Sequence, residues 1–395
     1  MQIREAQQGL LNNGLSFLAL GFRPFFLLAG LSAVLLMALW LGMLMGALPA
    51  PAYYGAVYWH GHEMLFGYTA AVIAGFLLTA TKNWTGFQTL RYWPLAGLAL
   101  LWILGRLLPW LAVPGWLIAL VDGAFLPLLA LALAFPLFRS RQKHNIPFVF
   151  LLLVMGLGNG MVHLALLGLF AGGVAIGNMI GMGMVLTLLV VMGGRVIPFF
   201  IERGLPGAQI RKWDVVEKLA LPGLLLYVLV QAVWPTTVLA ALVTLAVAVL
   251  HGWRVTGWYQ VRIWTNPMLW VLWLGYAFIV VGLLAQALGN LGLVPVLMSL
   301  HLLTVGGIGV LSLGMMARVA IGHTGRPMQA HRVTQLAFVL LVGAAVVRGL
   351  LPLLFPELYL WWLKIGGTLW LLAFAAFVGV YLPMLIRPRV DGQPG

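Results

Sequence analysis

Residues 25–48 read FFLLAGLSAVLLMALWLGMLMGAL and contain no charged side chain. A second long apolar stretch, residues 233–250, reads VWPTTVLAALVTLAVAVL. A run of roughly 20 apolar residues is long enough for an α-helix to cross the hydrocarbon core of a bilayer. A transmembrane β-strand would instead alternate apolar and polar residues in short segments. These stretches therefore predict helices that span a membrane.

The composition of the whole chain agrees with this prediction. Of the 395 residues, 63% are hydrophobic and 8% are charged. A water-soluble domain of this length could not cover so much apolar surface with polar groups. The predicted fold class is therefore all-α, a polytopic transmembrane bundle of about 12 spans joined by short connections.

The predicted spans are the apolar runs that lie between glycine, proline and polar breakers. They cover residues 24–48, 57–80, 93–112, 115–138, 147–170, 175–200, 218–233, 236–251, 266–288, 294–317, 333–351 and 358–386. Together they form a single transmembrane domain, 24–386, between an N-terminal segment, 1–23, and a C-terminal tail, 387–395. The polar start of the chain does not resemble a cleavable signal peptide, so the first span is expected to act as its own targeting signal.

The formal net charge of +14 is interpreted from where the charges lie. All Lys and Arg residues except Arg106, Arg348 and Lys364 fall at the termini, at connections or at the adjoining helix ends on one predicted side. The positive-inside rule then predicts that both termini are cytoplasmic, in a bacterial inner membrane. The basic loops are interpreted as topology signals among membrane lipids, and no nucleic-acid partner is expected.

The absence of cysteine limits the possible metal chemistry. Disulfides, thiolate metal sites and cysteine-held iron–sulfur clusters are excluded. Any metal must be bound by histidine, methionine, carboxylate or backbone groups.

Four of the eight histidines share one predicted depth, because a helix advances about 1.5 Å per residue. These are His60, His62, His163 and His301, all in the outer halves of their spans. A lone buried histidine is usually a hydrogen-bonding group between helices. Four at one depth favour a metal cofactor instead. Neutral imidazoles from two facing helices can supply both axial ligands of a haem iron without burying net charge.

A weak internal repeat selects the haem pair. His301-x4-Gly306 aligns with His62-x4-Gly67, and Asn178 begins the same pattern in the sixth predicted span. The repeat suggests three four-helix units with His62 and His301 in equivalent positions. We therefore predict that His62 and His301 hold one low-spin haem b.

The other two outer histidines are candidates for a second site. His60 projects roughly 200° away from His62, so the two cannot easily reach one metal. His60 and His163 are left for a second metal such as copper, or for a second haem. Asn159 lies four residues before His163 and is expected to hydrogen-bond it.

Three further residues are weaker candidates. Glu63 adjoins His62 and is a catalytic candidate that could carry protons or orient an imidazole, or it could be a solvated interfacial charge. Asp122, with no basic residue nearby in the sequence, is a weaker candidate for a proton path. His323 lies in the Gly- and Pro-containing loop 322–327 and is a low-ranked metal ligand, across the membrane from His62.

Several motifs together resemble the signature of the NnrS family. They run from the first predicted span to the loop after the tenth. They are GFRPFF (21–26), WHGHEMLFG (59–67), GFLLT (75–79), NWTG (83–86), GRVIPF (194–199), HLLTVGG (301–307) and GHTGRP (322–327).

The resemblance implies a twelve-span bacterial membrane protein associated with haem and copper, nitric oxide metabolism, denitrification and resistance to nitrosative stress. One position departs from it, because Trp273 stands where the family often has histidine. The architecture also resembles the haem-copper oxidase core subunit, with haem histidines on the second and tenth helices. The sixth span offers Asn178 where that subunit has a copper histidine, so oxygen reduction by its mechanism is not expected.

The leading functional hypothesis is a redox protein, an oxidoreductase candidate, that binds or converts nitric oxide or a related species with electrons from an unidentified donor. A transporter is the alternative, because Gly-rich helices such as 177–194 and internal repeats are also transporter features. A nitric oxide sensor or sink without turnover is the third possibility.

Overall fold

A computed structural model describes residues 15–140 and 143–393 of the chain. Residues 1–14 of the predicted N-terminal segment, Arg141 of one basic connection and the last two residues of the predicted tail lie outside this part. Within it, every regular element is a helix, and twelve helical stretches are long and apolar enough to cross a membrane. This confirms the predicted all-α, multi-pass architecture.

The structure places the twelve spans close to the predicted ranges. They are Phe22–Leu44, Ala56–Thr85, Tyr92–Trp110, Gly115–Arg139, Lys143–Leu166, Gly173–Gly204, Asp214–Val233, Val238–Gly257, Pro267–Asn290, Val296–His323, Arg332–Leu354 and Pro356–Ile386. The tenth span continues past its predicted end at residue 317. Arg318, which follows the predicted end, does not end the helix, because the backbone hydrogen bonds of a helix lie within it whatever the charge of a side chain.

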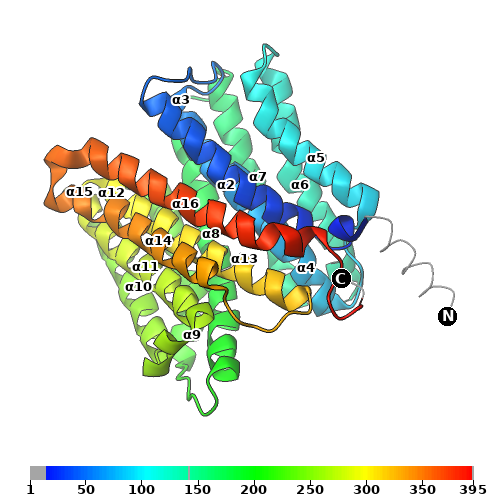
Figure 1. Cartoon of the computed structure of the whole chain (residues 1–395). Helices are drawn as coiled ribbons and strands as arrows, with labels where there is room; N and C mark the ends of the chain where they lie inside the picture. Colours follow the sequence, from blue (N-terminus) through cyan, green and yellow to red (C-terminus); the bar gives the residue numbers. More distant parts are fainter. Residues whose placement is uncertain (1–14, 141–142, 394–395) are drawn as a thin grey trace. The chain divides into compact units, whose positions relative to one another are not determined.

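The individual elements follow one another along the chain without a strand among the described residues (Figure 1). The longer ones are α2 (Phe22–Leu44), α3 (Ala56–His62), η2 (Glu63–Thr69), α4 (Ala70–Thr85), α5 (Tyr92–Leu107), α6 (Gly115–Arg139), α7 (Pro147–Leu166), α8 (Gly173–Gly204), α9 (Asp214–Val233), α10 (Val238–Gly257), α11 (Pro267–Asn290), α12 (Val296–His301), η6 (Leu302–Gly309), α13 (Val310–His323), α14 (Arg332–Gly349) and α16 (Tyr359–Ile386). The short ones are η1 (Leu15–Leu18), η3 (Leu108–Trp110), η4 (Lys143–Asn145), η5 (Val261–Thr265), α15 (Leu351–Leu354) and η7 (Pro356–Leu358).

Two of the spans contain a π-helical segment, and each segment starts directly after a histidine of the repeat. In the second span η2 follows His62, and in the tenth span η6 follows His301. π-Helical turns are rare and frequently occur at functional sites. The shared feature supports the equivalence of these two spans. α8, the sixth span, is α-helical throughout and lacks it.

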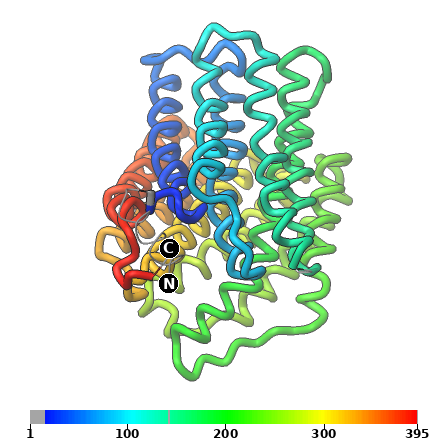
Figure 2. Tube along the Cα trace, turned by 90° about the vertical axis from the view of Figure 1, so that its right-hand side faces the viewer, coloured from blue at the N-terminus to red at the C-terminus, as the bar shows by residue number. Residues whose placement is uncertain are grey.

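The chain forms two compact units. Unit 1 comprises the residues up to Met184 together with Met316–Gln329 and the residues from Phe374 onward, and unit 2 comprises Val185–Met315 and Ala330–Ala373. In unit 1, α6 packs against α5, α7 and α4, and α4 also packs against α2. Figures 1 and 2 both show α5, α6 and α7 side by side. In unit 2, α10 packs against α9 and α11, and η6 packs against α11 and α14.

Candidate metal centre

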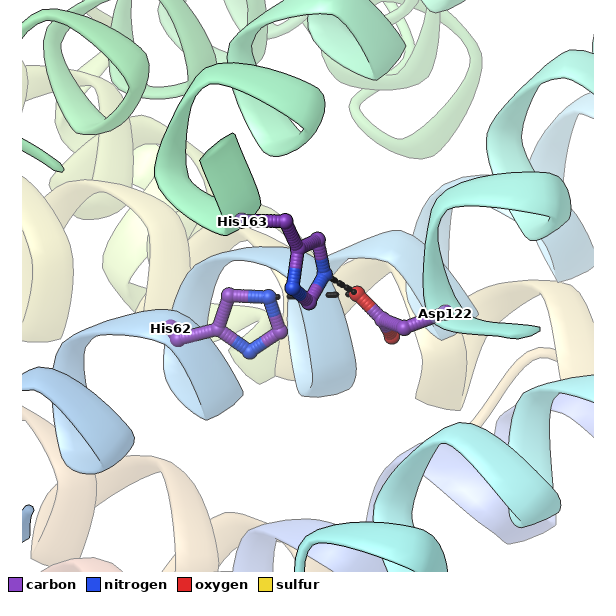
Figure 3. Close-up of side chains that lie close together, drawn as sticks. All are labelled: His62, Asp122 and His163. Atoms are coloured by element: carbon purple, nitrogen blue, oxygen red, sulfur yellow. Dashed lines mark hydrogen bonds and ion pairs between the residues drawn. The ribbon is translucent and has the colours of Figure 1, made fainter. Parts of the chain in front are cut away.

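One group of buried polar side chains of unit 1 gathers around three residues on three helices. His62 ends α3, Asp122 lies within α6, and His163 lies near the end of α7. Their exposed fractions are 0%, 4% and 2%. Ionisable residues within membrane spans face the bundle interior, where they can bind one another. Figure 3 shows that the three side chains point toward one another.

The Oδ2 atom of Asp122 is the hub of this cluster. It lies 2.9 Å from His163 Nε2 and 3.2 Å from His62 Nε2. It also accepts a hydrogen bond of 2.7 Å from Asn159 Nδ2. One ligand atom from each of His62, Asp122 and His163 lies within 4.8 Å of the others.

The prediction that Asn159 hydrogen-bonds His163 is wrong. Its Oδ1 lies 2.9 Å from His62 Nε2, and its amide group donates to Asp122. Both nitrogens of His163 already have other partners, because Nε2 contacts Asp122 and Nδ1 lies 3.0 Å from the Tyr53 hydroxyl. Asn159 therefore bridges His62 and Asp122.

Two tyrosines of the connection between α2 and α3 reach the cluster. Tyr53 contacts His163 as described, and the Tyr54 hydroxyl lies 3.4 Å from His62 Nε2. Burial, reinforced by the negative charge of Asp122, raises the pKa of Tyr53 to about 12. A neutral hydroxyl can either donate or accept, so Tyr53 can pair with either tautomer of His163.

Arg106 of α5 is the counter-charge of the cluster. Its Nε lies 2.7 Å from Glu63 Oε2, and its terminal nitrogen Nη2 binds Asp122 Oδ1. The Oε1 atom of Glu63 lies 3.5 Å from His62 Nδ1. Glu63 is 0% exposed, so the interpretation of Glu63 as a solvated interfacial charge is wrong.

The charge count of the cluster is unbalanced. With both carboxylates ionised and both imidazoles neutral, Glu63 and Asp122 carry two negative charges against the single positive charge of Arg106. An unpaired buried charge is costly. One proton on an imidazole or one monovalent cation would cancel this charge, and a divalent cation would leave one positive charge. The cluster is therefore suited to take up a proton or a metal cation.

Arg106 also holds the π-helical segment that follows His62. Its Nη1 donates to the carbonyl of Phe66, and Trp102 Nε1 donates to the carbonyl of Gly67 at 3.1 Å. A Cβ atom at Gly67 would lie 2.7 Å from Glu63 Oε2 and 3.3 Å from Arg106 Cδ. Glycine at this position of the repeat therefore lets α5 and the Glu63 side chain approach.

Sequence reasoning underestimated Asp122 and missed Arg106. The two are distant in the sequence, but consecutive antiparallel spans bring them together. A signal was present, because Arg106 is one of three cations that depart from the predicted charge pattern. Arg348 is another, and it is also buried, with Nη2 3.1 Å from the Tyr359 hydroxyl. Buried ion pairs and hydrogen bonds, rather than topology, account for both positions.

The remaining predicted ligands lie outside this cluster. The ring of His60 stacks on Trp40, with centroids 4.4 Å apart. His301, in unit 2, places Nδ1 2.6 Å from the Leu297 carbonyl. His323 ends α13, and its ring lies 5.5 Å from that of Phe22. The predicted haem pair divides between the units, with His62 in unit 1 and His301 in unit 2, and stays a prediction.

Trp273, the departure from the family pattern, has a structural contact of its own. Its Nε1 donates to the Val255 carbonyl at 3.1 Å within unit 2. At this position, where the resemblance implies that histidine is frequent, the chain has a hydrogen bond between α11 and α10.

The donor set fits a single metal ion. Two imidazole nitrogens, a carboxylate oxygen and the amide oxygen of Asn159 match the ligands that copper, zinc and non-haem iron accept. Groups hydrogen-bonded behind the ligands are typical of metal sites, and Tyr53 lies behind His163 as Glu63 lies behind His62.

A haem fits less well on His62 in this arrangement. Oxygen atoms of Asn159, Asp122 and Tyr54 lie within 3.4 Å of His62 Nε2, and these side chains would have to move. The ring of His301 is different. Its Nδ1–H can donate to a backbone carbonyl, which leaves Nε2 as the basic nitrogen.

A sequence model of one protein family, described as NnrS protein, matches residues 16–389. The match covers nearly the whole chain and confirms the resemblance seen in the motifs. A search of curated proteins found no match to this chain.

Proposed function

We propose that this chain, which belongs to the NnrS family, is a metal-containing redox protein of nitric oxide metabolism. Membership of this family supports a membrane protein related to nitric oxide. It binds or converts nitric oxide or a related nitrogen species. The observation that carries the proposal is the buried group of His62, Asp122 and His163. The concentration of Lys and Arg on one predicted side supports a bacterial inner-membrane location with cytoplasmic termini.

The residues of the cluster have distinct roles in this proposal. His62 Nε2, His163 Nε2 and Asp122 Oδ2 bind the metal ion, for which copper is the first candidate, and Asn159 Oδ1 is available as a fourth donor. When bound, such an ion supplies one-electron chemistry and a coordination position for a small ligand.

The other side chains hold these donors in place. Arg106 fixes the free oxygen of Asp122, and Tyr53 and Glu63 orient the two imidazoles. Without the ion, the cluster can hold one proton, because Glu63 and Asp122 carry one negative charge more than Arg106 compensates. Metal binding would release that proton, because imidazole ligands bind metals in their neutral form.

A haem b is the second cofactor of the proposal, with His301 Nε2 as its ligand, because His62 Nε2 is assigned to the metal ion. Such a haem would accept electrons from a separate donor and make the protein an oxidoreductase. A sensor or sink would use the same metal without turnover, whereas a transporter has no requirement for it.

The test is the metal content of protein purified from cells supplied with copper and haem. We expect a bound transition metal at about one equivalent per chain. Asp122→Asn and His163→Ala should lose it. His60→Ala is the matched control, because His60 has a similar predicted depth and lies outside the cluster. Equal metal content in all three variants and the wild type would contradict the proposed site. A metal-free, colourless wild type would favour a transporter.

A further inference from the structure

Two sequence motifs have no part in the metal centre, and they meet elsewhere in unit 1. Motif 21–26 begins α2, and motif 322–327 follows α13. The ring of Phe22 lies 5.5 Å from that of His323, and the Phe22 amide donates to Thr79 Oγ1 at 3.0 Å. The ends of four helices, α2, α4, α13 and α16, thereby form one surface region.

The buried side chain of Arg23 links the start of α2 to the end of α16 in this region. It is 1% exposed, and its Nη1 donates to the carbonyls of Leu385 at 2.9 Å and Arg387 at 2.6 Å. These carbonyls belong to the C-terminal end of α16, where unpaired carbonyls carry partial negative charge. The Nε atom of Arg23 has no hydrogen-bond partner among the described residues.

The chain after α16 folds over the loop of the second motif. The Val390 amide donates to the Thr324 carbonyl at 3.2 Å, and Arg389 Nη1 donates to the His323 carbonyl at 3.2 Å. Gly325 has a φ of +75°, and a Cβ there would lie 2.7 Å from the Asp391 carboxylate. The backbone of this region is therefore fixed by contacts between distant segments.

The region concentrates positive charge. Lys82, Arg326 and Arg389 are close enough to Arg23 or His323 to interact with them electrostatically. Asp391 is the single carboxylate of unit 1, within the described residues, that lies outside the metal centre. Both of its oxygens already accept hydrogen bonds from Arg389.

We propose that this basic region binds an oxyanion of the phosphate type. We define the basic region by Arg23, Lys82, His323, Arg326 and Arg389. Guanidinium and ammonium groups bind phosphate oxygens by charge-assisted hydrogen bonds, and basic pockets at the cytoplasmic ends of spans bind anionic headgroups. The basic region contains more cations than carboxylates, so a bound anion would balance its excess positive charge. The phosphate group belongs either to a free anion or to the headgroup of an anionic lipid.

The test compares the two sources on the whole protein. Inorganic phosphate is titrated against detergent-purified protein, with chloride at equal ionic strength as the reference. Nanodiscs of phosphatidylglycerol or phosphatidylcholine are compared by native mass spectrometry of retained lipid. The variant is Lys82→Gln with Arg326→Gln, because within the described part of the chain neither side chain hydrogen-bonds to another segment, and Arg326 donates only to the nearby Thr324 carbonyl. The matched control is Arg203→Gln with Lys212→Gln, two exposed cations of unit 2 on the same predicted side.

We expect the Lys82/Arg326 variant to bind the phosphate group about thirty-fold more weakly, and the control to bind as the wild type does. Binding of inorganic phosphate would identify a free anion, and selective retention of phosphatidylglycerol would identify a lipid. The proposal is overturned if neither ligand binds, or if variant and control lose affinity equally.

Discussion

His62 and His301 stand at the same point of two different spans, since each is the last α-helical residue before a π-helical segment. Both segments also contain a repeat glycine in close contact with a neighbouring helix. Gly67 faces Arg106 of α5, and Gly306 lies where a Cβ would be 2.6 Å from the Phe278 ring of α11. The weak sequence repeat thus corresponds to a backbone geometry that is shared by the two candidate haem ligands.

The first prediction concerns haem. His301→Ala should remove the haem spectrum, because the Nδ1 contact with Leu297 leaves Nε2 as the nitrogen able to bind iron. His62→Ala should do the same if the two residues share one haem. Reduced-minus-oxidised spectra and haem content per chain measure both effects. His323→Ala is the control and should leave the spectrum intact. Unchanged spectra in all variants would refute the assignment, and loss in His301→Ala alone would leave His62 to the metal cluster.

The second prediction orders two substitutions by the charge they leave behind. Arg106→Gln leaves Glu63 and Asp122 as two buried carboxylates without a cation, and should lower the free energy of unfolding by about 3–5 kcal/mol. Asp122→Asn leaves Arg106 paired with Glu63 and should cost about 1–3 kcal/mol. Unfolding by denaturant in detergent measures both. Lys364→Gln is the control, because Lys364 is an exposed cation that also departs from the charge pattern, and its effect should stay within about 0.5 kcal/mol. A larger loss in Asp122→Asn than in Arg106→Gln would contradict the charge count.

The third prediction concerns Tyr53. Tyr53→Phe removes the hydroxyl next to His163 Nδ1 and should weaken metal binding about 10–100-fold, as loss of such supporting groups usually does. Competition with a chelator measures the change. Tyr58→Phe is the control, since Tyr58 is 52% exposed. Equal affinity of the Tyr53 variant and the wild type would show that the hydroxyl does not support the site.

The raised pKa of Tyr53 predicts that the stability of the fold depends on pH. The pKa of Tyr53 is raised from 10.0 to about 12 by burial, so the unfolded chain ionises first as the pH rises. The stabilisation from keeping Tyr53 neutral is complete below pH 10 and is lost as the pH approaches 12. Unfolding measured across this interval should show a shallower decline for Tyr53→Phe than for the wild type. Parallel declines would argue against the burial of this hydroxyl.

The fourth prediction concerns the segment after α16. The hydrogen bonds from Arg389 lower the pKa of Asp391 from 3.8 to about 2. A lowered carboxyl pKa means that this contact stabilises the fold above pH 3.8 and is lost as the pH falls through about 2. Asp391→Asn should therefore speed hydrogen exchange of residues 387–393 at pH 5 but change it little near pH 2. Exchange that differs equally at both pH values would show that ionisation of Asp391 is not the cause.

The fifth prediction is the orientation of the chain. The charge pattern predicts that both termini are cytoplasmic, and two of its three exceptions are explained by burial. A reporter that is active only in the cytoplasm should be active when fused after Gly395. Activity restricted to a periplasmic reporter would reverse the predicted sides of every span.

The sequence by itself determined the number and approximate position of the spans, because crossing a bilayer depends on the length of a local apolar run. It also identified His62, His163 and Glu63 as candidate functional residues, because ionisable groups are rare and costly inside a membrane. Those properties belong to single segments. They can be derived without knowing which segments touch.

Only the tertiary structure decided which of these residues act together. The grouping of His62 with His163 rather than His60 depends on the rotation of each helix about its axis. The roles of Asp122 and Arg106 depend on which spans are neighbours. A hydropathy pattern gives neither the rotation of a helix nor its neighbours. An apolar helix can face lipid or protein with nearly the same side chains. The candidate metal site was therefore visible in the sequence as scattered polar residues, and packing of α3, α5, α6 and α7 brought them into one buried cluster.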